Sequence, residues 1–388
     1  MHQQHVRPSR TTRERVHSVQ LLPLQEVASQ IRPGAPLAWS IRDGNGKLLL
    51  ARGHPVTDVA MLQALLARGM FVDAAEVRGA GGRDVQPPKE GFFGRWRLSS
   101  ARLNTLLTAP PSELGAALSE VADVLMGLAD RYPDKVLFQI LRHDQTRLNA
   151  YGVSHSLHSG AVCCLTGKRL GWSADERRML VGAALSMNLS MIELQGRLAV
   201  QGAKPTPEQR AAIEAHPRKS VEMLEAAGVK DPLWLAAVEQ HHERVDGSGY
   251  PCGRTDIAEL AQALQYVDIF TAKLAARSSR APLPPDQAAR EIFTASAGHP
   301  QVAALVKEFG IYPPGCFVRL ASGETAIVIH RGPSVKSPVV ACLTRPNGQP
   351  VMRPQRRDTD SKESAVVAIV ADSDVMVRVP WESLYSDD

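Results

Sequence analysis

The spacing of apolar positions changes twice along the chain and divides it into three parts. Residues 18–80 contain short apolar runs, and one pair of runs flanks Asp43-Gly44-Asn45-Gly46. Asn and Gly tolerate positive φ, so this tetrapeptide predicts a hairpin. We therefore expect a small mixed α/β module. Its expected elements are two strands, a helix and a returning strand: Leu37–Arg42, Lys47–Ala51, Thr57–Arg68 and Met70–Val77.

Residues 99–313 have apolar positions at helical spacing almost throughout. Capping residues mark three helix starts, at Ser173, Thr206 and Asp231. Pro207 follows Thr206 at the first helical position, where its missing N–H is not needed. This part is expected to form a helical bundle.

After Pro313-Pro314 the apolar runs become short and β-rich. Turn sequences at Ser322-Gly323-Glu324 and Asn347-Gly348 separate several of them, which is typical of antiparallel strands. We expect a small C-terminal β module of four or five strands. The candidate strands are Phe317–Leu320, Ala326–Ile329, Val339–Leu343, Val366–Val370 and Val375–Val379.

Two segments lack this periodicity. Residues 1–17 are polar and rich in Arg, and predict a flexible basic tail. Residues 81–98 begin with clustered Gly and Pro, and predict a linker. The expected fold is mainly α, with a central helical domain over 99–313 and small β-containing modules at 18–80 and 314–388.

Composition narrows the class of protein. Among 388 residues, 44% are hydrophobic and 22% charged, as in ordinary globular proteins. No apolar run reaches the roughly 18–20 residues that cross a bilayer, and the N-terminus lacks a signal core. A net charge of +5 with 5% aromatics disfavours nucleic-acid binding. Five cysteines without a CxxC pair indicate free thiols, so we expect a cytoplasmic protein.

The stretch His241–Pro251, HHERVDGSGYP, gives the strongest chemical signal. Adjacent helical side chains diverge by about 100°, so the two histidines could reach two metal ions, or one ion and a phosphate. Imidazole binds Zn, Fe and Mn, and Glu243 and Asp246 are placed to orient the rings. The Gly-Ser-Gly sequence predicts an exposed turn that a ligand or partner could approach. A solvated helix end, where His complements the dipole, is the alternative.

Further candidates lie on the predicted helices. His155 and His158 are three residues apart and share a helix face. His216 directly precedes a proline and is expected to begin a helix. Asp268 lies within the apolar helix Leu260–Leu274, where a carboxylate is unfavourable unless it is paired or ligated. A core hydrogen bond, cap or ion pair is the alternative for each.

The motif resembles the signature of HD-GYP domains, helical metal phosphodiesterases of the HD superfamily that cleave the bacterial messenger cyclic di-GMP. The resemblance covers roughly residues 140–300 and implies a central HD-superfamily bundle. The implied metal ligands are His155, His216, His241, His242 and Asp268. Arginine suits phosphate through its forked geometry. The implied nucleotide-binding residues are Arg277, Arg280, Gly249, Tyr250 and Pro251.

The chain departs from the family at its central positions. The family has a His-Asp dipeptide after an apolar helix and a Lys three residues later, whereas Ser186, Met187 and Ser190 stand here. The family's Asp bridges two ions, and a soft, neutral thioether does not replace it. The resemblance therefore implies that no catalytic set is intact. It leaves open one divalent metal (Fe, Mn or Zn) or none.

Three functions remain open. The favoured one is a bacterial cyclic di-GMP signalling protein, acting as a nucleotide receptor or a protein-interaction adaptor with impaired or no hydrolysis. The second is an active phosphodiesterase with a rearranged metal site, in which Glu193, Asn188 or another nearby group supplies a missing ligand. The third is a purely structural interaction protein. The expected partners are cyclic di-GMP or a related cyclic dinucleotide and, through the Gly249-Tyr250-Pro251 loop, a GGDEF-type synthase or another signalling protein.

Overall fold

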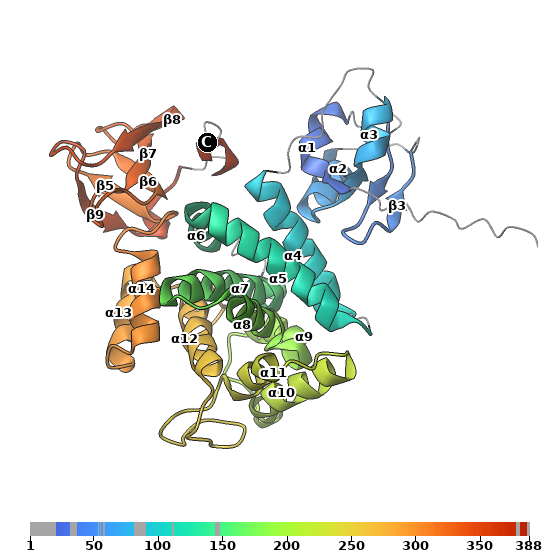
Figure 1. The fold of residues 1–388 in the computed structure, drawn as a ribbon. Coiled ribbons are helices and arrows are strands. Elements are labelled where there is room, and N and C mark those ends of the chain that lie inside the picture. The colour runs from blue at the N-terminus through green and yellow to red at the C-terminus, as the bar shows by residue number, and fades with distance from the viewer. Residues whose placement is uncertain are drawn as a thin grey trace, which may run out of the picture. The chain divides into compact units, whose positions relative to one another are not determined.

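The computed structural model describes residues 21–31, 37–52, 54, 56, 59–80, 91–110, 112–143, 148–377 and 381–385. The chain forms two compact units, Met1–Lys89 and Glu90–Asp388 (Figure 1). The expected tail at 1–17 lies outside the described residues. Among the helices that are described, none is long and apolar enough to span a bilayer.

The first unit contains a four-stranded antiparallel sheet in the order β1-β4-β2-β3. The predicted hairpin is confirmed, because Arg42 pairs with Leu48 and the Asp43 carboxylate accepts two turn amides. The predicted return strand is too long: Asp73 accepts a hydrogen bond from the amide of Ala75 and begins a helix. The elements are β1 (Leu21–Pro23), α1 (Leu24–Val27), η1 (Ala28–Gln30), β2 (Ile41–Arg42), β3 (Leu48–Leu50), α2 (Val59–Ala67), β4 (Phe71–Asp73) and α3 (Ala74–Ala80).

The second unit begins with a helical bundle. Capping boxes at Ser173 and Thr206 and a side-chain cap at Asp231 start helices where the sequence predicts them. The helices are α4 (Phe92–Thr108), α5 (Leu114–Arg131), α6 (Pro133–Arg142), α7 (Tyr151–Leu170), α8 (Ala174–Ser186), α9 (Ile192–Val200), α10 (Pro207–Ala226), α11 (Pro232–Gln240), α12 (Glu259–Leu274), α13 (Pro285–Ala295) and α14 (Pro300–Phe309), with the short 3₁₀ turns η2 (Leu148–Ala150) and η3 (Leu189–Met191).

The predicted linker over 81–98 is wrong in its last part. Residues 92–98 belong to α4, because Phe92 and Trp96 are buried in the bundle core. Buried aromatic side chains give a helix more stability than nearby glycines remove. Residues 81–90 lie outside the described part of the chain.

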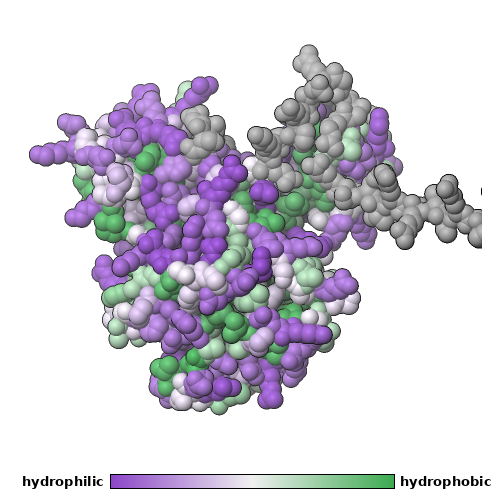
Figure 2. All heavy atoms as spheres, in the orientation of Figure 1, coloured by the Kyte–Doolittle hydropathy of each residue, from purple (hydrophilic) through white to green (hydrophobic). Residues whose placement is uncertain are grey.

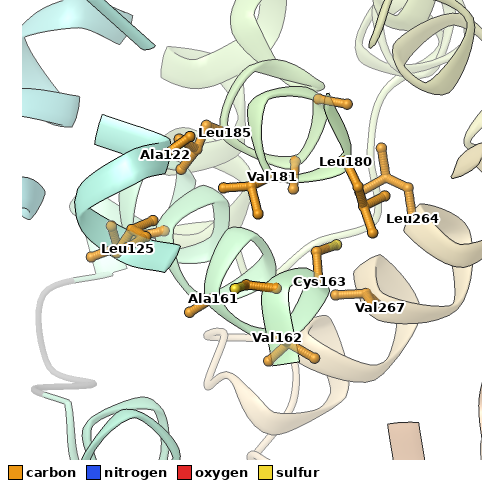
Figure 3. Close-up of a cluster of buried hydrophobic side chains, with 14 of the residues drawn as sticks. Ala122, Leu125, Ala161, Val162, Cys163, Leu180, Val181, Leu185, Leu264 and Val267 are labelled. Atoms are coloured by element: carbon orange, nitrogen blue, oxygen red, sulfur yellow. The ribbon is translucent and has the colours of Figure 1, made fainter. Parts of the chain in front are cut away.

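Helix α7 is the central helix of the bundle and is buried along almost its whole length. Figure 3 shows Cys163 of α7 between Leu180 of α8 and Val267 of α12, with Leu264 beside them. Burial raises the pKa of the Cys163 thiol well above its usual value, so the thiol stays neutral and acts as a core residue. The buried part of α7 also includes the candidate ligand His155.

The C-terminal strands form one five-stranded antiparallel sheet in the order β8-β7-β6-β5-β9. Four predicted strands are confirmed. The expected strand at Val375–Val379 is not formed at residues 375–377, and residues 378–379 lie outside the described part of the chain. The fifth strand, β8, was missed because its sequence PVMRPQRRD is polar and mostly exposed, as an edge strand can be. The strands are β5 (Phe317–Leu320), β6 (Thr325–His330), β7 (Val339–Thr344), β8 (Pro350–Asp358) and β9 (Val366–Val370), followed by η4 (Asp372–Asp374) and η5 (Trp381–Tyr385).

This sheet shares a core with the bundle. Phe138 of α6 packs among Phe317, Ile327 and Tyr385. Arg331 bridges two carboxylates of the bundle, Asp134 at 2.5 Å and Glu308 at 2.8 Å. The expected fold class, mainly α with β-containing modules at both ends, is confirmed. Figure 2 shows a predominantly hydrophilic face with dispersed apolar side chains.

Candidate functional site

Four helices bring the five expected metal ligands together. His155 lies on α7, His216 on α10 and Asp268 on α12, while His241 and His242 directly follow α11. The nearest ring nitrogens of His216, His241 and His242 all lie within 4.8 Å of one another. His155 Nε2 lies 2.7 Å from a carboxylate oxygen of Asp268. Residues 113 positions apart in the sequence thus form one polar cluster inside the bundle.

The proline after His216 suggested that a helix begins at His216. The structure shows that it does not. The capping box at Thr206 starts α10 much earlier, and α10 continues through Pro217 to Ala226. His216 is therefore on an interior turn with its side chain buried. Its Nδ1 atom lies 2.5 Å from the carbonyl oxygen of Ile213.

His216 and His241 face each other through the same ring atom. The Nδ1 of His241 lies 2.7 Å from the carbonyl oxygen of Val238, and the two Nε2 atoms are 3.2 Å apart. A carbonyl only accepts hydrogen bonds, so both Nδ1 atoms hold the ring hydrogen. A neutral imidazole has one such hydrogen, and both Nε2 atoms therefore present lone pairs to each other.

Two lone pairs at this distance repel unless a positive charge lies between them. A proton is disfavoured there, since burial, followed by the nearby His242, lowers the pKa of His216 to about 4. Burial also lowers the pKa of His241 well below its usual value. Neutral imidazoles are common metal ligands, so this donor set fits a divalent cation.

Asp268 gives the cluster its negative charge. Burial acts to raise the pKa of Asp268, but the hydrogen bond from His155 and the neighbouring histidines hold it well below the usual range. The carboxylate is therefore ionised, and it lies close enough to His241 and His242 to affect the pKa of both. A largely enclosed carboxylate, with its side chain 15% exposed, is a group that a cation would neutralise.

Tyr151 was not predicted and connects the cluster to the arginine expected at the phosphate. Its ring stacks on His155, with centroids 5.3 Å apart, and the Arg277 guanidinium lies 4.7 Å from its centroid. Arg277 also donates a 2.5 Å hydrogen bond to the Tyr151 hydroxyl. Arg280 donates to the carbonyl of Ala272 and is exposed. A buried Tyr that needs a hydrogen-bond partner was the available signal.

The three positions that differ from the family by the resemblance make hydrogen bonds or pack in the core. The buried Ser186 hydroxyl donates to the carbonyl of Gly182 and accepts from Trp234 Nε1 at 2.9 Å. Met187 is fully buried in the main core. Ser190 Oγ lies 3.0 Å from the carbonyl oxygen of His216. None of these three side chains offers a charge to the cluster.

The position over Gly182 is also filled. A Cβ atom at Gly182 would lie 2.7 Å from the indole ring of Trp234, so that ring packs directly on the backbone of α8. The suggested substitute ligand Glu193 has a side chain that is 79% exposed and pairs with Arg197 instead. Glu193 is therefore directed to solvent rather than to the histidines.

Glu243 and Asp246 do not orient the histidine rings as expected. The two Glu243 carboxylate oxygens accept hydrogen bonds from the amides of Cys252 and Arg254, at 2.7 and 2.9 Å. Asp246 is exposed and accepts from the amide and hydroxyl of Ser248. Both carboxylates therefore shape the loop between α11 and α12, which extends from the ends of those helices (Figure 1).

Side-chain amides that the sequence did not indicate also hold this loop. Gln265 Nε2 donates to the carbonyls of His241 and Glu243, and the Gln240 side chain accepts from the amide of Ala258. At Gly249 a Cβ atom would lie 2.4 Å from a backbone nitrogen, so only glycine fits.

This close passage places Tyr250 beside the cluster. The Tyr250 ring stacks on His242, with centroids 4.6 Å apart and planes at 27°. The ring centroid of His216 is 6.3 Å from that of Tyr250. Tyr250 of the Gly249-Tyr250-Pro251 segment therefore lies next to the histidines.

This part of the chain is similar to known proteins. Residues 135–299 match the HD domain family. A cyclic di-GMP phosphodiesterase of Pseudomonas aeruginosa is 29% identical over 221 residues, 53% of each chain. A cyclic di-GMP phosphodiesterase response regulator of Xanthomonas campestris is 31% identical over 119 residues, 30% of this chain and 32% of the relative. A 3′3′-cGAMP-specific phosphodiesterase of Vibrio cholerae is 28% identical over 141 residues, 36% and 30% of the two chains.

The match spans about half the length of the Pseudomonas relative and about a third of the other two. A solved structure described as an HDG"Y"P protein from Bdellovibrio bacteriovorus aligns with a TM-score of 0.48 at 16% identity, covering 72% of this chain and 96% of that one. The family match and the curated relatives, together with the His241–Pro251 motif, show that this chain is an HD-GYP-like protein with its HD domain at residues 135–299.

Proposed function

We propose that the protein binds a cyclic dinucleotide, cyclic di-GMP or a close relative, and hydrolyses it poorly or not at all. The observation that carries this proposal is the facing pair of Nε2 atoms on His216 and His241, 3.2 Å apart. This pair supports the binding of one metal ion between the two rings. The buried Met187 supports the loss of a second one, because no carboxylate is available there to bridge two ions.

The donor set suits a single divalent metal. Three imidazoles and a nearby carboxylate are ligands that Fe, Mn and Zn accept. His216, His241 and His242 would hold the ion, and Asp268 would balance its charge. A bound ion would supply positive charge to a phosphate oxygen. In-line hydrolysis by two metals needs a bridging ligand that Met187 cannot provide. We therefore expect the protein to bind the nucleotide without hydrolysing it efficiently.

The nucleotide is proposed from the relatives and from the groups around the cluster. The curated relatives are named as phosphodiesterases of cyclic di-GMP or 3′3′-cGAMP. Arg277 is positioned beside the histidines through Tyr151, and a guanidinium is well suited to a phosphodiester. Tyr250 offers an aromatic face next to His242. Together these groups support an anionic ligand with a flat base.

Turnover and binding are tested separately on purified protein. Cyclic di-GMP is incubated with Mn²⁺ or, anaerobically, with Fe²⁺, and both substrate and product are quantified. Equilibrium dialysis with the same nucleotide measures binding in the wild type and in His241→Ala. We expect intact nucleotide and binding that weakens in the variant. Sustained turnover that His241→Ala abolishes would favour an active phosphodiesterase with a rearranged site, and absence of binding with every metal would favour a structural role.

The loop also supports a protein-binding role, which we propose as compatible with the first. Val245 is 65% exposed, and the neighbouring Arg244 and Arg254 are exposed as well. Since Glu243 and Gln265 hold the loop in one conformation, it offers a defined surface. Pull-down of a GGDEF-type synthase by the wild type, lost in Val245→Asp but retained in the buried-site variant His241→Ala, is the expected result.

A further inference from the structure

We infer that Pro217 is a positioning residue for the metal site, because it frees the carbonyl group that fixes the tautomer of His216. This inference rests on the proposed metal site. In an α-helix, the N–H of residue 217 would donate to the carbonyl of Ile213. Proline has no N–H, so that carbonyl loses its usual donor. Helix α10 nevertheless continues through Pro217 to Ala226.

The ring of the preceding residue uses the freed carbonyl. His216 Nδ1 lies 2.5 Å from the Ile213 oxygen, within hydrogen-bond distance. This contact keeps the ring hydrogen on Nδ1 and turns the lone pair of Nε2 toward His241. A proline inside a helix normally leaves one carbonyl without a donor, but here the His216 ring supplies a donor to the Ile213 carbonyl. This contact also selects which nitrogen is available to a metal.

His241 reaches the same tautomer by a different route. Helix α11 ends at Gln240, and the last carbonyls of a helix have no partner within it. Val238 contributes one of these carbonyls, and His241 Nδ1 lies 2.7 Å from it. In the interior of α10 each carbonyl normally already accepts a backbone N–H, so a ring N–H would have to share it unless the residue that would donate has no N–H. Proline at 217 leaves a free carbonyl inside a helix, as the end of α11 does for His241.

The expected consequence concerns both the tautomer and the metal affinity. An N–H at position 217 competes for the Ile213 carbonyl, so the His216 ring loses the contact that selects Nδ1–H. Hydrogen bonds that orient metal-binding histidines typically change metal affinity about 10- to 100-fold. We expect Pro217→Ala to weaken Mn²⁺ or Zn²⁺ binding by about tenfold.

The direct test is long-range ¹H–¹⁵N NMR of the histidine rings in metal-free protein. We expect the Nδ1–H tautomer at His216 and at His241 in the wild type. In Pro217→Ala, His216 should acquire Nε2–H character while His241 does not change. Pro207→Ala is the matched control, because Pro207 is at the first position of the same helix, where no N–H is needed. It should leave both rings unchanged.

The inference is overturned if His216 keeps a pure Nδ1–H tautomer in Pro217→Ala, or lacks it in the wild type. Pro217→Val, which also restores the N–H, replaces Pro217→Ala if circular dichroism shows that the alanine variant is unfolded. Titration with Zn²⁺ against a chelator then measures affinity. If the wild type binds no metal, the proposed function fails, whereas the tautomer result still decides the role of Pro217.

Discussion

Replacing Met187 by Asp is expected to destabilise the protein rather than to restore a site for two metals. By the resemblance noted in the sequence, position 187 takes the place of the family's bridging carboxylate, but the structure places its side chain in the main core with no exposed surface. The hydroxyl of the neighbouring Ser186 accepts a hydrogen bond from the indole N–H of Trp234. A carboxyl group at 187 would therefore enter an apolar environment.

The magnitude follows from two terms. Complete burial of a Met side chain contributes about 1.5–3 kcal/mol, which the shorter Asp largely loses. Burying a carboxyl group without a partner adds about 1–3 kcal/mol, even if the group becomes protonated. The sum is about 2.5–6 kcal/mol, a large part of the 5–15 kcal/mol that is typical for folded proteins.

Urea denaturation followed by circular dichroism, with and without Mn²⁺, measures this change. Met187→Leu is the matched control, because it keeps the volume and apolar character and should change stability by less than about 1.5 kcal/mol. The reasoning is refuted if Met187→Asp is as stable as Met187→Leu. It is also refuted if Mn²⁺ rescues the Asp variant and cyclic di-GMP is then hydrolysed, since the carboxylate would have reached a metal.

Three other outcomes are expected. Arg277→Ala should weaken cyclic di-GMP binding about tenfold, because one charge-assisted hydrogen bond to the nucleotide is lost, whereas replacing the exposed Arg290 by Ala should not weaken it. Equal affinities of wild type and Arg277→Ala by calorimetry contradict the assigned role. Glu243→Gln should speed hydrogen exchange at one of the two loop amides, those of Cys252 and Arg254, because the glutamine side chain keeps only one acceptor oxygen; unchanged exchange at both amides argues against these contacts. Hydrogen bonding from Arg177 lowers the pKa of Asp130 from 3.8 to about 2, so its ion pair stabilises the folded protein above pH 3.8 and is lost as the pH falls through 2. Because Asp130 is partly exposed, Asp130→Asn should lower stability at pH 7 by less than about 1 kcal/mol in urea titrations, and a difference that persists below pH 2 contradicts this account.

Local features of the fold were predictable because they depend on short-range chemistry. The capping residues Ser173 and Thr206 satisfy amides within their own first turn, so a few residues determine where α8 and α10 start. The Asp43–Lys47 turn is local in the same way. Strand β8 was missed because an exposed edge strand needs no apolar alternation, and its pairing with β7 is decided by the neighbouring strand.

The candidate ligands were identified in the sequence through a motif, but their roles depend on contacts with distant residues. Glu243 was expected beside the histidines, and its carboxylate instead binds the amides of Cys252 and Arg254 after the loop turns back. Tyr151 and Arg277 are 126 residues apart and meet only because α7 and the segment after α12 are neighbours. No periodicity in the sequence encodes such a meeting.

The sequence by itself determined the class of fold and the helix starts at Ser173, Thr206 and Asp231, and it supplied the His and Asp candidates for a metal site. The tertiary structure alone decided that His216 and His241 face each other through Nε2, and that Met187 is enclosed in the core. The physical reason is that helix caps and turns are satisfied within a few residues, whereas ring orientation and burial are fixed by packing between helices that are far apart in the chain.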